Sequence, residues 1–346
     1  MTGQYQAAVA AQQPGHWTAR GQEFQATQSL ELPLGDPWAS QSLEDRQARL
    51  QQTALRGTPR QKGDFLENEV FISTFDFGHV TDTLDGQMRH AKLFGSKGGL
   101  RVAGEGGSGK DAIIRYCMKR RPSYQVGSNK ICPLISVTLG GYLAPTEILG
   151  SLHTQLGSAH KAYQGIKSLE ELLLEALSAC QTEGIIFNEA QHMLRVSRPK
   201  SRSELRISGR EGDWLKGFID RLPIPQFFFG VPGWDDIFNH DRQLGTRIPN
   251  RYDLTVPNEA TFLGILQALD EAIPMPEPAG LVAPRFAEPI LKITKANWRL
   301  IIKLLRPALE SAAYADAERI QTQDLSYSYF LNFGAEGNPF GKPRTL

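Results

Sequence analysis

The sequence predicts an α/β fold in which a parallel β-sheet is covered by helices on both faces. Short apolar runs, which are typical of buried strands, alternate with segments of helical periodicity between about residues 64 and 257. From Asn258 to about Tyr329 only helical segments follow. A glycine-rich loop separates the first strand from its helix. Together these observations predict an α/β core followed by a helical lid.

The glycine-rich loop nearly matches the phosphate-binding P-loop pattern G-x-x-x-x-G-K-[ST]. It follows the strand at residues 100–103 and opens a helix, and it departs only at its last position, where Asp111 replaces a hydroxyl. In such a loop the backbone N–H groups face phosphate oxygens, and Lys110 reaches the β- and γ-phosphates. The alternative is an ordinary turn. The candidate nucleotide-binding residues are Gly104, Glu105, Gly106, Gly107, Ser108, Gly109, Lys110 and Asp111.

A second motif, Ile-Ile-Phe-Asn-Glu at residues 185–189, supplies the acidic half of the site. P-loop proteins end this strand with an aspartate that holds Mg²⁺ and a glutamate that polarises the attacking water. Glu189 is present, but Asn188 replaces the aspartate. With Asp111, one carboxylate is lost and one is gained. Asp111 and Asn188 are therefore candidate metal ligands in a swapped magnesium site. The alternative is a decayed site that binds ATP and hydrolyses it slowly or not at all.

Apolar periodicity and turn residues locate the other elements of the core. A helix at residues 80–91 precedes the first strand, and Pro145 suits the first turn of another. Ser168 to Glu171 form a capping box that opens a further helix. The remaining segments are a helix at residues 214–222 and strands at residues 134–139, 184–189, 226–230 and 252–256.

Residues 1–62 differ in composition from the rest of the chain. They hold 12 glutamines and few aliphatic residues, so they bury too little apolar area to offset the entropy of ordering. They form either a floppy tail or a partner-docking arm anchored by Trp17 and Trp38, with a short helix near residues 43–52. We expect a flexible glutamine-rich arm at residues 1–62, a nucleotide-binding core at 63–257, a helical lid at 258–330 and a C-terminal tail at 331–346.

Composition excludes several classes of protein. A net charge of +1 and a hydrophobic content of 40% describe a soluble globular chain and argue neither for nor against nucleic acid. The longest apolar runs are too short to cross a bilayer, and no secretion signal begins the sequence. Cys117, Cys132 and Cys180 are too widely spaced for a disulfide framework or a metal site. We expect a cytoplasmic protein without a membrane partner.

Several blocks from about Phe71 to Asp324 together resemble the TniB/TnsC-type AAA+ ATPases of DNA transposition, with the phage MuB protein as a distant relative. The P-loop alone indicates only a nucleoside triphosphatase, whereas the order of the blocks is specific. The blocks are GEGGSGKD, SVTLGGYLAPTEILGSLHTQLG, GIIFNEAQHML, IPQFFFGVPGWDDIF, RQLGTRIPNRYDL, ITKANWRLIIKLL and IQTQDL.

The resemblance implies an AAA+ P-loop NTPase with a five-stranded parallel sheet in the order 5-1-4-3-2 and a C-terminal helical lid. It implies ATP and Mg²⁺ as cofactors, and ATPase activity that is weak because both motifs depart from their usual residues. The expected partners are duplex DNA bound through its backbone, further copies of the chain in a ring or helical filament, and a transposase. A target-selection protein would bind the N-terminal arm or the C-terminal tail.

The resemblance also assigns roles to single residues. Arg247 matches the arginine that one subunit places against the nucleotide of the next, and Arg251 is the close alternative. Arg299 lies where the sensor arginine of the lid is expected. Residues 229–232, Phe-Gly-Val-Pro, lack the polar sensor side chain often found after this strand. The candidate catalytic residues are Glu189, Arg247, Arg251 and Arg299.

Basic residues in three segments are candidates for contacts with DNA phosphates. Six basic residues and one acid lie between Arg195 and Arg210, and such loops give sequence-independent, salt-sensitive binding. The alternative is a solvated charged loop. The family contacts DNA from two other loops, here residues 140–142 and 158–167. The candidate DNA-binding residues are Tyr142, Lys161, Lys167, Arg198, Lys200 and Arg202.

Three functions compete on these residues. The first is an ATP-dependent regulator that assembles on duplex DNA and activates a transposase. The second is a nucleotide-gated oligomeric adaptor with little or no hydrolysis. The third is a metabolic P-loop kinase, which needs a site for an acceptor substrate and a lid over it. The chain offers an intersubunit arginine and a helical lid instead, which disfavours the kinase.

Overall fold

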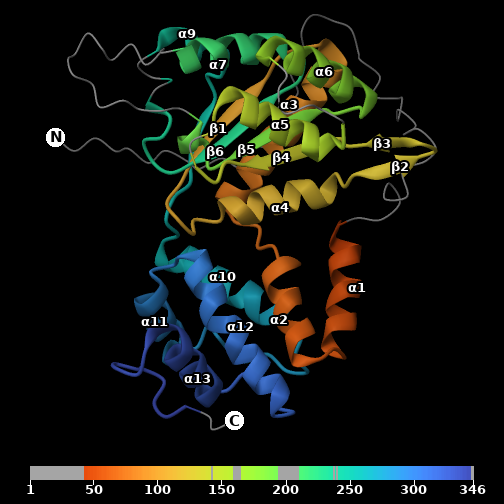
Figure 1. The fold of residues 1–346 in the computed structure, drawn as a ribbon. Coiled ribbons are helices and arrows are strands. Elements are labelled where there is room, and N and C mark those ends of the chain that lie inside the picture. The colour runs from red at the N-terminus through yellow and green to blue at the C-terminus, as the bar shows by residue number, and fades with distance from the viewer. Residues whose placement is uncertain are drawn as a thin grey trace, which may run out of the picture. The chain divides into compact units, whose positions relative to one another are not determined.

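The computed structural model describes residues 43–141, 143–158, 165–193, 210–236, 238 and 241–343. Its centre is a five-stranded parallel sheet in the order β4-β5-β6-β1-β7 (Figure 1). When these strands are numbered along the chain, this is the predicted order 5-1-4-3-2, which is therefore confirmed. The strands are β1 (Gly99–Ala103), β4 (Leu134–Thr138), β5 (Gly184–Asn188), β6 (Gln226–Gly230) and β7 (Arg251–Asp253).

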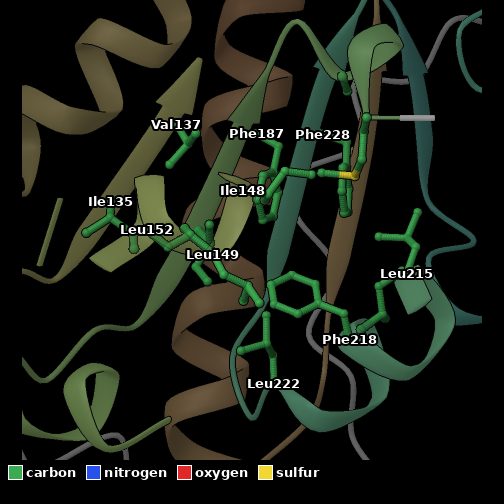
Figure 2. Packing of buried hydrophobic residues seen from close by; sticks show 14 of the residues in the cluster. Ile135, Val137, Ile148, Leu149, Leu152, Phe187, Leu215, Phe218, Leu222 and Phe228 are labelled. Carbon is green, nitrogen blue, oxygen red and sulfur yellow. The ribbon is translucent and has the colours of Figure 1, made fainter. Parts of the chain in front are cut away.

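The inner strands are buried on both faces, as parallel strands under helices must be. Every residue of β1, β5 and β6 is buried, and alternate side chains of β6 point to opposite faces. Phe228 packs with Phe187 and Phe218 on one face, as Figure 2 shows. Phe227 and Phe229 belong to the apolar cluster on the other face. The continuous apolar runs seen in the sequence therefore form the middle layer of a three-layer core.

Helices cover both faces of this sheet. α3 (Phe75–Phe94) and α4 (Lys110–Arg120) contribute to the cluster of Phe227 and Phe229. α5 (Pro145–Leu156), α6 (Ile166–Ala179) and α7 (Arg210–Arg221) contribute to the cluster of Phe228. Two short elements complete the core, the 3-10 turn η1 (Ala190–His192) and α9 (Arg242–Arg247).

The start of α6 differs from the sequence expectation. We predicted that a capping box beginning at Ser168 opens this helix, but the helix begins at Ile166, with Gly165 as its N-cap. Glu170 faces inward, where its carboxylate accepts hydrogen bonds from Trp214 Nε1 at 2.9 Å and Arg221 Nη2 at 2.6 Å. Contacts with α7 therefore engage the Glu170 side chain, which does not cap the start of α6.

A hairpin between α4 and β4 was not predicted. β2 (Tyr124–Val126) and β3 (Asn129–Ile131) pair antiparallel, and the turn between them begins with Gly127 at φ 61°. A glycine at positive φ suits a two-residue hairpin turn, so the Gly-Ser dipeptide was the available signal. The strands have only three residues each, which is too short to show an alternating pattern.

The lid contains more of the chain than the sequence indicated. Its helices are α10 (Glu259–Ala272), α11 (Pro284–Thr294), α12 (Trp298–Tyr314) and α13 (Thr322–Phe333). α1 (Leu43–Leu55) and α2 (Pro59–Asn68) precede the core in sequence, yet α2 packs against α12 (Figure 1). The helix expected near residues 43–52 is present and longer. Residues 43–62 are thus folded rather than a flexible arm.

Local and tertiary contacts explain this boundary. Thr58 and Gln61 form a capping box at the start of α2. Leu66 is fully buried in the apolar cluster of the lid, and Lys62 Nζ donates to the carbonyl oxygens of Leu55 and Pro274 at 2.6 Å and 2.8 Å. At the other end Phe340, which we assigned to the tail, is buried in the same cluster.

None of the helices in the described ranges is long and apolar enough to cross a membrane.

Candidate nucleotide-binding site

The glycine-rich loop joins β1 to α4 with the geometry that a phosphate cradle requires. Gly107 and Gly109 have φ values of 81° and 102°, a region that other residues rarely adopt. A Cβ atom at Gly107 would also collide with the side chain of Asn297 from the lid. Gly109 is the N-cap of α4, so the N-terminus of that helix faces the loop. Both glycines are therefore needed for the shape of the loop.

Lys110 lies inside the loop. Only 6% of the residue is exposed, and Nζ donates to the carbonyl oxygens of Gly104 at 2.5 Å and Glu105 at 2.9 Å. Burial lowers the pKa of Lys110, while the carboxylates of Glu189 and Asp111 act in the opposite direction. The ammonium group is thus held at the centre of the cradle by backbone oxygens of the loop.

A cavity of about 600 Å³ opens beside the loop. Five cationic and three acidic side chains line it, an excess of positive charge that favours a polyphosphate. The acids are Glu67, Asp111 and Glu189, and the cations are Lys110, Arg115, Arg299, Lys303 and Arg306.

A second, more apolar cavity of about 390 Å³ adjoins the loop at Ser108 and Gly109. Its wall includes Ile113 from α4, Leu254 after β7 and Ile265 from the lid. Mostly apolar walls with a few polar groups are typical of pockets that hold an aromatic ring. The two cavities therefore offer an apolar compartment and a cationic compartment that both adjoin one glycine loop and share Gly109 in their walls.

The structure brings together the two residues that depart from the usual motifs. Asn188 Nδ2 donates to Asp111 Oδ1 at 3.1 Å, and Asn188 Oδ1 accepts from the Glu189 N–H at 3.0 Å. A carboxylate only accepts and an N–H only donates, so this amide orientation is the one that satisfies both neighbours. Asn188 consequently turns its N–H toward Asp111 rather than its oxygen.

Mg²⁺ prefers oxygen ligands, and Asp111 and Asn188 differ in whether they offer one. The Asp111 carboxylate lines the cationic cavity and its side chain is 55% exposed, so it fits the role of a ligand. Asn188 differs from our expectation, because its oxygen is held by the Glu189 backbone. In place of two metal ligands, the structure has one candidate ligand, the Asp111 carboxylate, which accepts a hydrogen bond from the Asn188 amide. No cluster of three or more His, Cys, Asp or Glu that could hold a metal occurs among the described residues.

The lid contacts the loop through the start of α12. Asn297 caps this helix, since its Oδ1 accepts from Leu300 N at 3.2 Å, and its Nδ2 donates to Gly106 O at 2.5 Å. The Trp298 N–H donates to Gly107 O at 2.8 Å. Arg299 follows, and its Nη2 lies 3.3 Å from Asp111 Oδ2. Sequence reasoning identified Arg299 but missed Asn297, whose capping position was the available signal.

Glu189 occupies a strained position at the end of β5. Its φ and ψ of 58° and 43° are left-handed, a conformation that is uncommon for residues other than glycine and that clusters at functional sites. Its carboxylate accepts a hydrogen bond from Gln191 Nε2. Glu189 lines the same cavity as Lys110, Asp111 and Arg299, so predicted residues from the glycine loop, the end of β5 and the lid converge there.

The two candidate intersubunit arginines lie outside this cavity. Arg247 makes a bidentate pair with Asp220, with Nε–Oδ1 at 2.8 Å and Nη2–Oδ2 at 2.6 Å. These hydrogen bonds raise the pKa of the Arg247 guanidinium and lower the pKa of the Asp220 carboxyl. Arg251 Nε lies 3.0 Å from Asp235, and Arg251 Nη2 lies 3.0 Å from Asp253. Each arginine is therefore held by a carboxylate of its own chain.

Asp235 is a buried acid that sequence reasoning missed. It is 0% exposed, and its Oδ2 lies 3.1 Å from Arg101 Nη1 of β1 and 3.0 Å from Arg251 Nε. Burial raises the pKa of Asp235, an effect that the two arginines partly oppose. Two cations around one buried carboxylate anchor the segment after β6 to the sheet. Arg251 is committed to this structural cluster more firmly than Arg247 is to exposed Asp220.

Most of the predicted DNA-binding residues lie outside the described part of the chain. Lys167 is exposed in the first turn of α6, as a phosphate contact requires. The other candidates lie outside the described ranges, namely Tyr142, Lys161, Arg198, Lys200 and Arg202.

Comparison with known proteins agrees with this fold. Similar solved structures include the Cdc6 protein from Pyrobaculum aerophilum, at 14% identity over 78% of this chain and 71% of that chain with a TM-score of 0.55. The Aeropyrum pernix ORC2 protein in its ADP form has 13% identity over 80% and 73% of the two chains, with a TM-score of 0.57. The Aeropyrum pernix ORC1 protein, solved in complex with DNA, has 14% identity over 80% and 68%, with a TM-score of 0.51.

These neighbours are AAA+ P-loop ATPases, so the fold is the AAA+ fold that the sequence predicted. No curated protein sequence matches the chain. The family described as bacterial TniB protein matches residues 62–253, which is more than half of the chain and contains the loop, Asn188, Glu189 and Arg247. The chain belongs to the TniB family and is a TniB-type AAA+ ATPase.

Proposed function

We propose that the chain is an ATP-dependent, DNA-binding regulator of transposition that oligomerises on duplex DNA and recruits or activates the transposase at the target site. The observation that carries this proposal is the convergence of the glycine loop, Glu189 and the lid residue Arg299 on one cationic cavity. Family membership supports the link to transposition. The DNA in the ORC1 complex supports DNA as a partner by analogy of fold only.

The triphosphate would lie along the cationic cavity and the base in the apolar one. The backbone N–H groups of the loop and Lys110 would bind the phosphates, and burial of Lys110 strengthens that interaction because little water screens it. Mg²⁺, held by Asp111, would neutralise negative charge on the phosphate oxygens. Glu189 would accept a hydrogen bond from the attacking water, and Arg299 would bring the lid toward the phosphates.

Arg247 would complete the site from a neighbouring copy. Only about a quarter of its side chain is exposed, whereas its partner Asp220 is 53% exposed, so the pair lies at the surface with the carboxylate outermost. The phosphates of a nucleotide bound to a neighbouring subunit would compete with Asp220 for the Arg247 guanidinium, whose planar shape suits bidentate binding of either group. A site built from two copies makes turnover depend on assembly.

A nucleotide-gated adaptor with little hydrolysis is the second candidate. Two observations favour it, namely the amide at Asn188 in place of a carboxylate and the absence of a polar side chain at residues 229–232. The two candidates differ in turnover but not in nucleotide binding or assembly.

Phosphate release and particle size measured on the full chain test both. With ATP, Mg²⁺ and duplex DNA, we expect assembly and DNA-stimulated release of phosphate. Lys110→Ala should abolish both, because it removes the one buried lysine of the cradle. Lys119→Ala is the matched control, since Lys119 lies on the same helix and pairs with Glu69 outside the loop. Assembly without phosphate release would favour the adaptor, and unchanged ATP affinity in Lys110→Ala would contradict the site itself.

A further inference from the structure

We propose that Gln191 is a positioning residue for ATP hydrolysis, which holds the Glu189 carboxylate and replaces the polar sensor side chain that β6 lacks. This inference rests on the proposed hydrolysis and adds a residue to it. The role concerns the orientation of Glu189 rather than contact with nucleotide.

Gln191 bridges the ends of two neighbouring strands. Its Nε2 donates to Glu189 Oε2, and its Oε1 accepts from the Val231 N–H at 3.3 Å. The carboxylate only accepts and the backbone N–H only donates, so both contacts fix the same orientation of the amide.

The bridge lies where a sensor would act. β5 and β6 pair in parallel, with Ile185 opposite Gln226 and Phe187 opposite Phe228, so both strands end at the same edge of the sheet. Glu189 and Val231 follow these ends and both line the cationic cavity. Residues 229–232 bring only Phe, Gly, Val and Pro to that edge. Gln191 therefore supplies a polar side chain at the end of β6 from the adjacent segment.

Glu189 needs a second support because its backbone leaves the strand in a left-handed turn. Asn188 holds the Glu189 N–H, which orients the main chain, and Gln191 holds one oxygen of the side chain. Among the described residues no side chain donates a hydrogen bond to the other carboxylate oxygen, which would accept from water. Lys110, Asp111 and Arg299 line the same cavity from α4 and α12, so an unsupported Glu189 would turn toward the two cations.

Two substitutions separate the two contacts of Gln191. Gln191→Met keeps the length of the side chain and removes both hydrogen bonds. Gln191→Glu keeps an acceptor for the Val231 N–H but places a carboxylate against Glu189. If holding Glu189 is the role, kcat should fall about 10- to 100-fold in Gln191→Met and further in Gln191→Glu. The KM for ATP and the ATP-dependent assembly on DNA should change less than about threefold in both, because Gln191 does not line either cavity.

Controls distinguish this inference from the proposed function. Gln155→Met changes an exposed glutamine on α5 and should leave kcat unchanged. Gln191→Met should add little to the loss caused by Glu189→Gln, because it acts through Glu189. A higher kcat in Gln191→Glu than in Gln191→Met would show that the Val231 contact matters instead and would overturn the proposal. So would an unchanged or raised kcat in Gln191→Met when Glu189→Gln is inactive. Full activity of Glu189→Gln, or no turnover by the unmodified chain, would contradict the proposed hydrolysis and this inference together.

Discussion

The contact between Asp111 and Asn188 makes a quantitative prediction about how these two positions depend on each other. Asn188→Asp removes an N–H donor that lies 3.1 Å from the Asp111 carboxylate and replaces it with a second negative charge. A hydrogen bond to a charged group contributes about 1.5 kcal/mol at the low end of its range, which suits a carboxylate that is 55% exposed. Two carboxylates at this distance repel by about 5 kcal/mol at an effective dielectric constant of about 20.

Exposure of Asp111 reduces the repulsion to about 1–2 kcal/mol, because water screens one partner of the pair. The total cost to the arrangement is thus about 3 kcal/mol, or roughly a hundredfold in an equilibrium constant. Asp111→Thr removes the carboxylate that faces both Asn188 and Arg299, and leaves Mg²⁺ without an acid at either position. Combining the two changes restores the hydroxyl and the carboxylate of the usual motifs, so each change should relieve the defect of the other.

The assay is a double-mutant cycle on DNA-stimulated phosphate release at several concentrations of Mg²⁺-ATP. We expect each single variant to lose at least about tenfold in kcat/KM and the double variant to return to within a few-fold of the unmodified chain. The coupling energy should be at least about 2 kcal/mol, because two tenfold losses sum to about 2.7 kcal/mol and the double variant keeps only a few-fold loss. Asn129→Asp, at an exposed position at the start of β3, provides a matched amide-to-acid control. Additive effects, with Asn188→Asp alone raising turnover, would refute a coupled pair and leave a decayed magnesium site.

Two further predictions concern assembly and DNA. If Arg247 acts on the nucleotide of a neighbouring subunit, a 1:1 mixture of inactive Arg247→Ala and Glu189→Gln subunits should recover about a quarter of the turnover. About a quarter of randomly formed head-to-tail interfaces would join an intact Arg247 to an intact Glu189. Recovery with Arg251→Ala in place of Arg247→Ala would assign the role to Arg251. DNA binding should be independent of sequence and should weaken steeply as the salt concentration rises. Replacing Arg198, Lys200 and Arg202 together by alanine should reduce the slope of log K against log[salt] by up to the contribution of about three phosphate contacts. An unchanged slope, measured by fluorescence anisotropy, would make that segment an ordinary solvated loop.

The sequence predicted those features that depend on neighbouring residues in the chain. The loop at residues 104–111 is contiguous, and its glycines adopt the backbone angles that the motif requires. The apolar runs of β5 and β6 indicated buried parallel strands, because helices on both faces demand apolar side chains on both faces. The strand order came from the resemblance, since periodicity alone does not say which strands are neighbours.

Contacts between distant segments could not be predicted in this way. Asp220 and Arg247 are 27 residues apart, and Asn297 lies 191 residues from Gly106. Neither pair shares a helix turn or a strand face, so only the tertiary fold brings them together. The boundary near residue 62 was misplaced for the same reason. Leu66 has its apolar partners in the lid, which follows the whole core in sequence, and average composition does not reveal such partners.

The charged groups expected to act on ATP all have partners within the chain, and these partners differ in strength. Lys110 is buried and bonded to two loop carbonyls, whereas the Arg299–Asp111 pair is more than half exposed on both sides. An exposed pair contributes about 0–1 kcal/mol, so a phosphate or Mg²⁺ displaces it at little cost. We therefore expect the Arg299–Asp111 contact to break first when nucleotide binds, while Lys110 and the loop keep their shape. Because Asn297 and Trp298 attach α12 to the loop beside Arg299, we expect a change at bound phosphates to reach the lid through the start of this one helix.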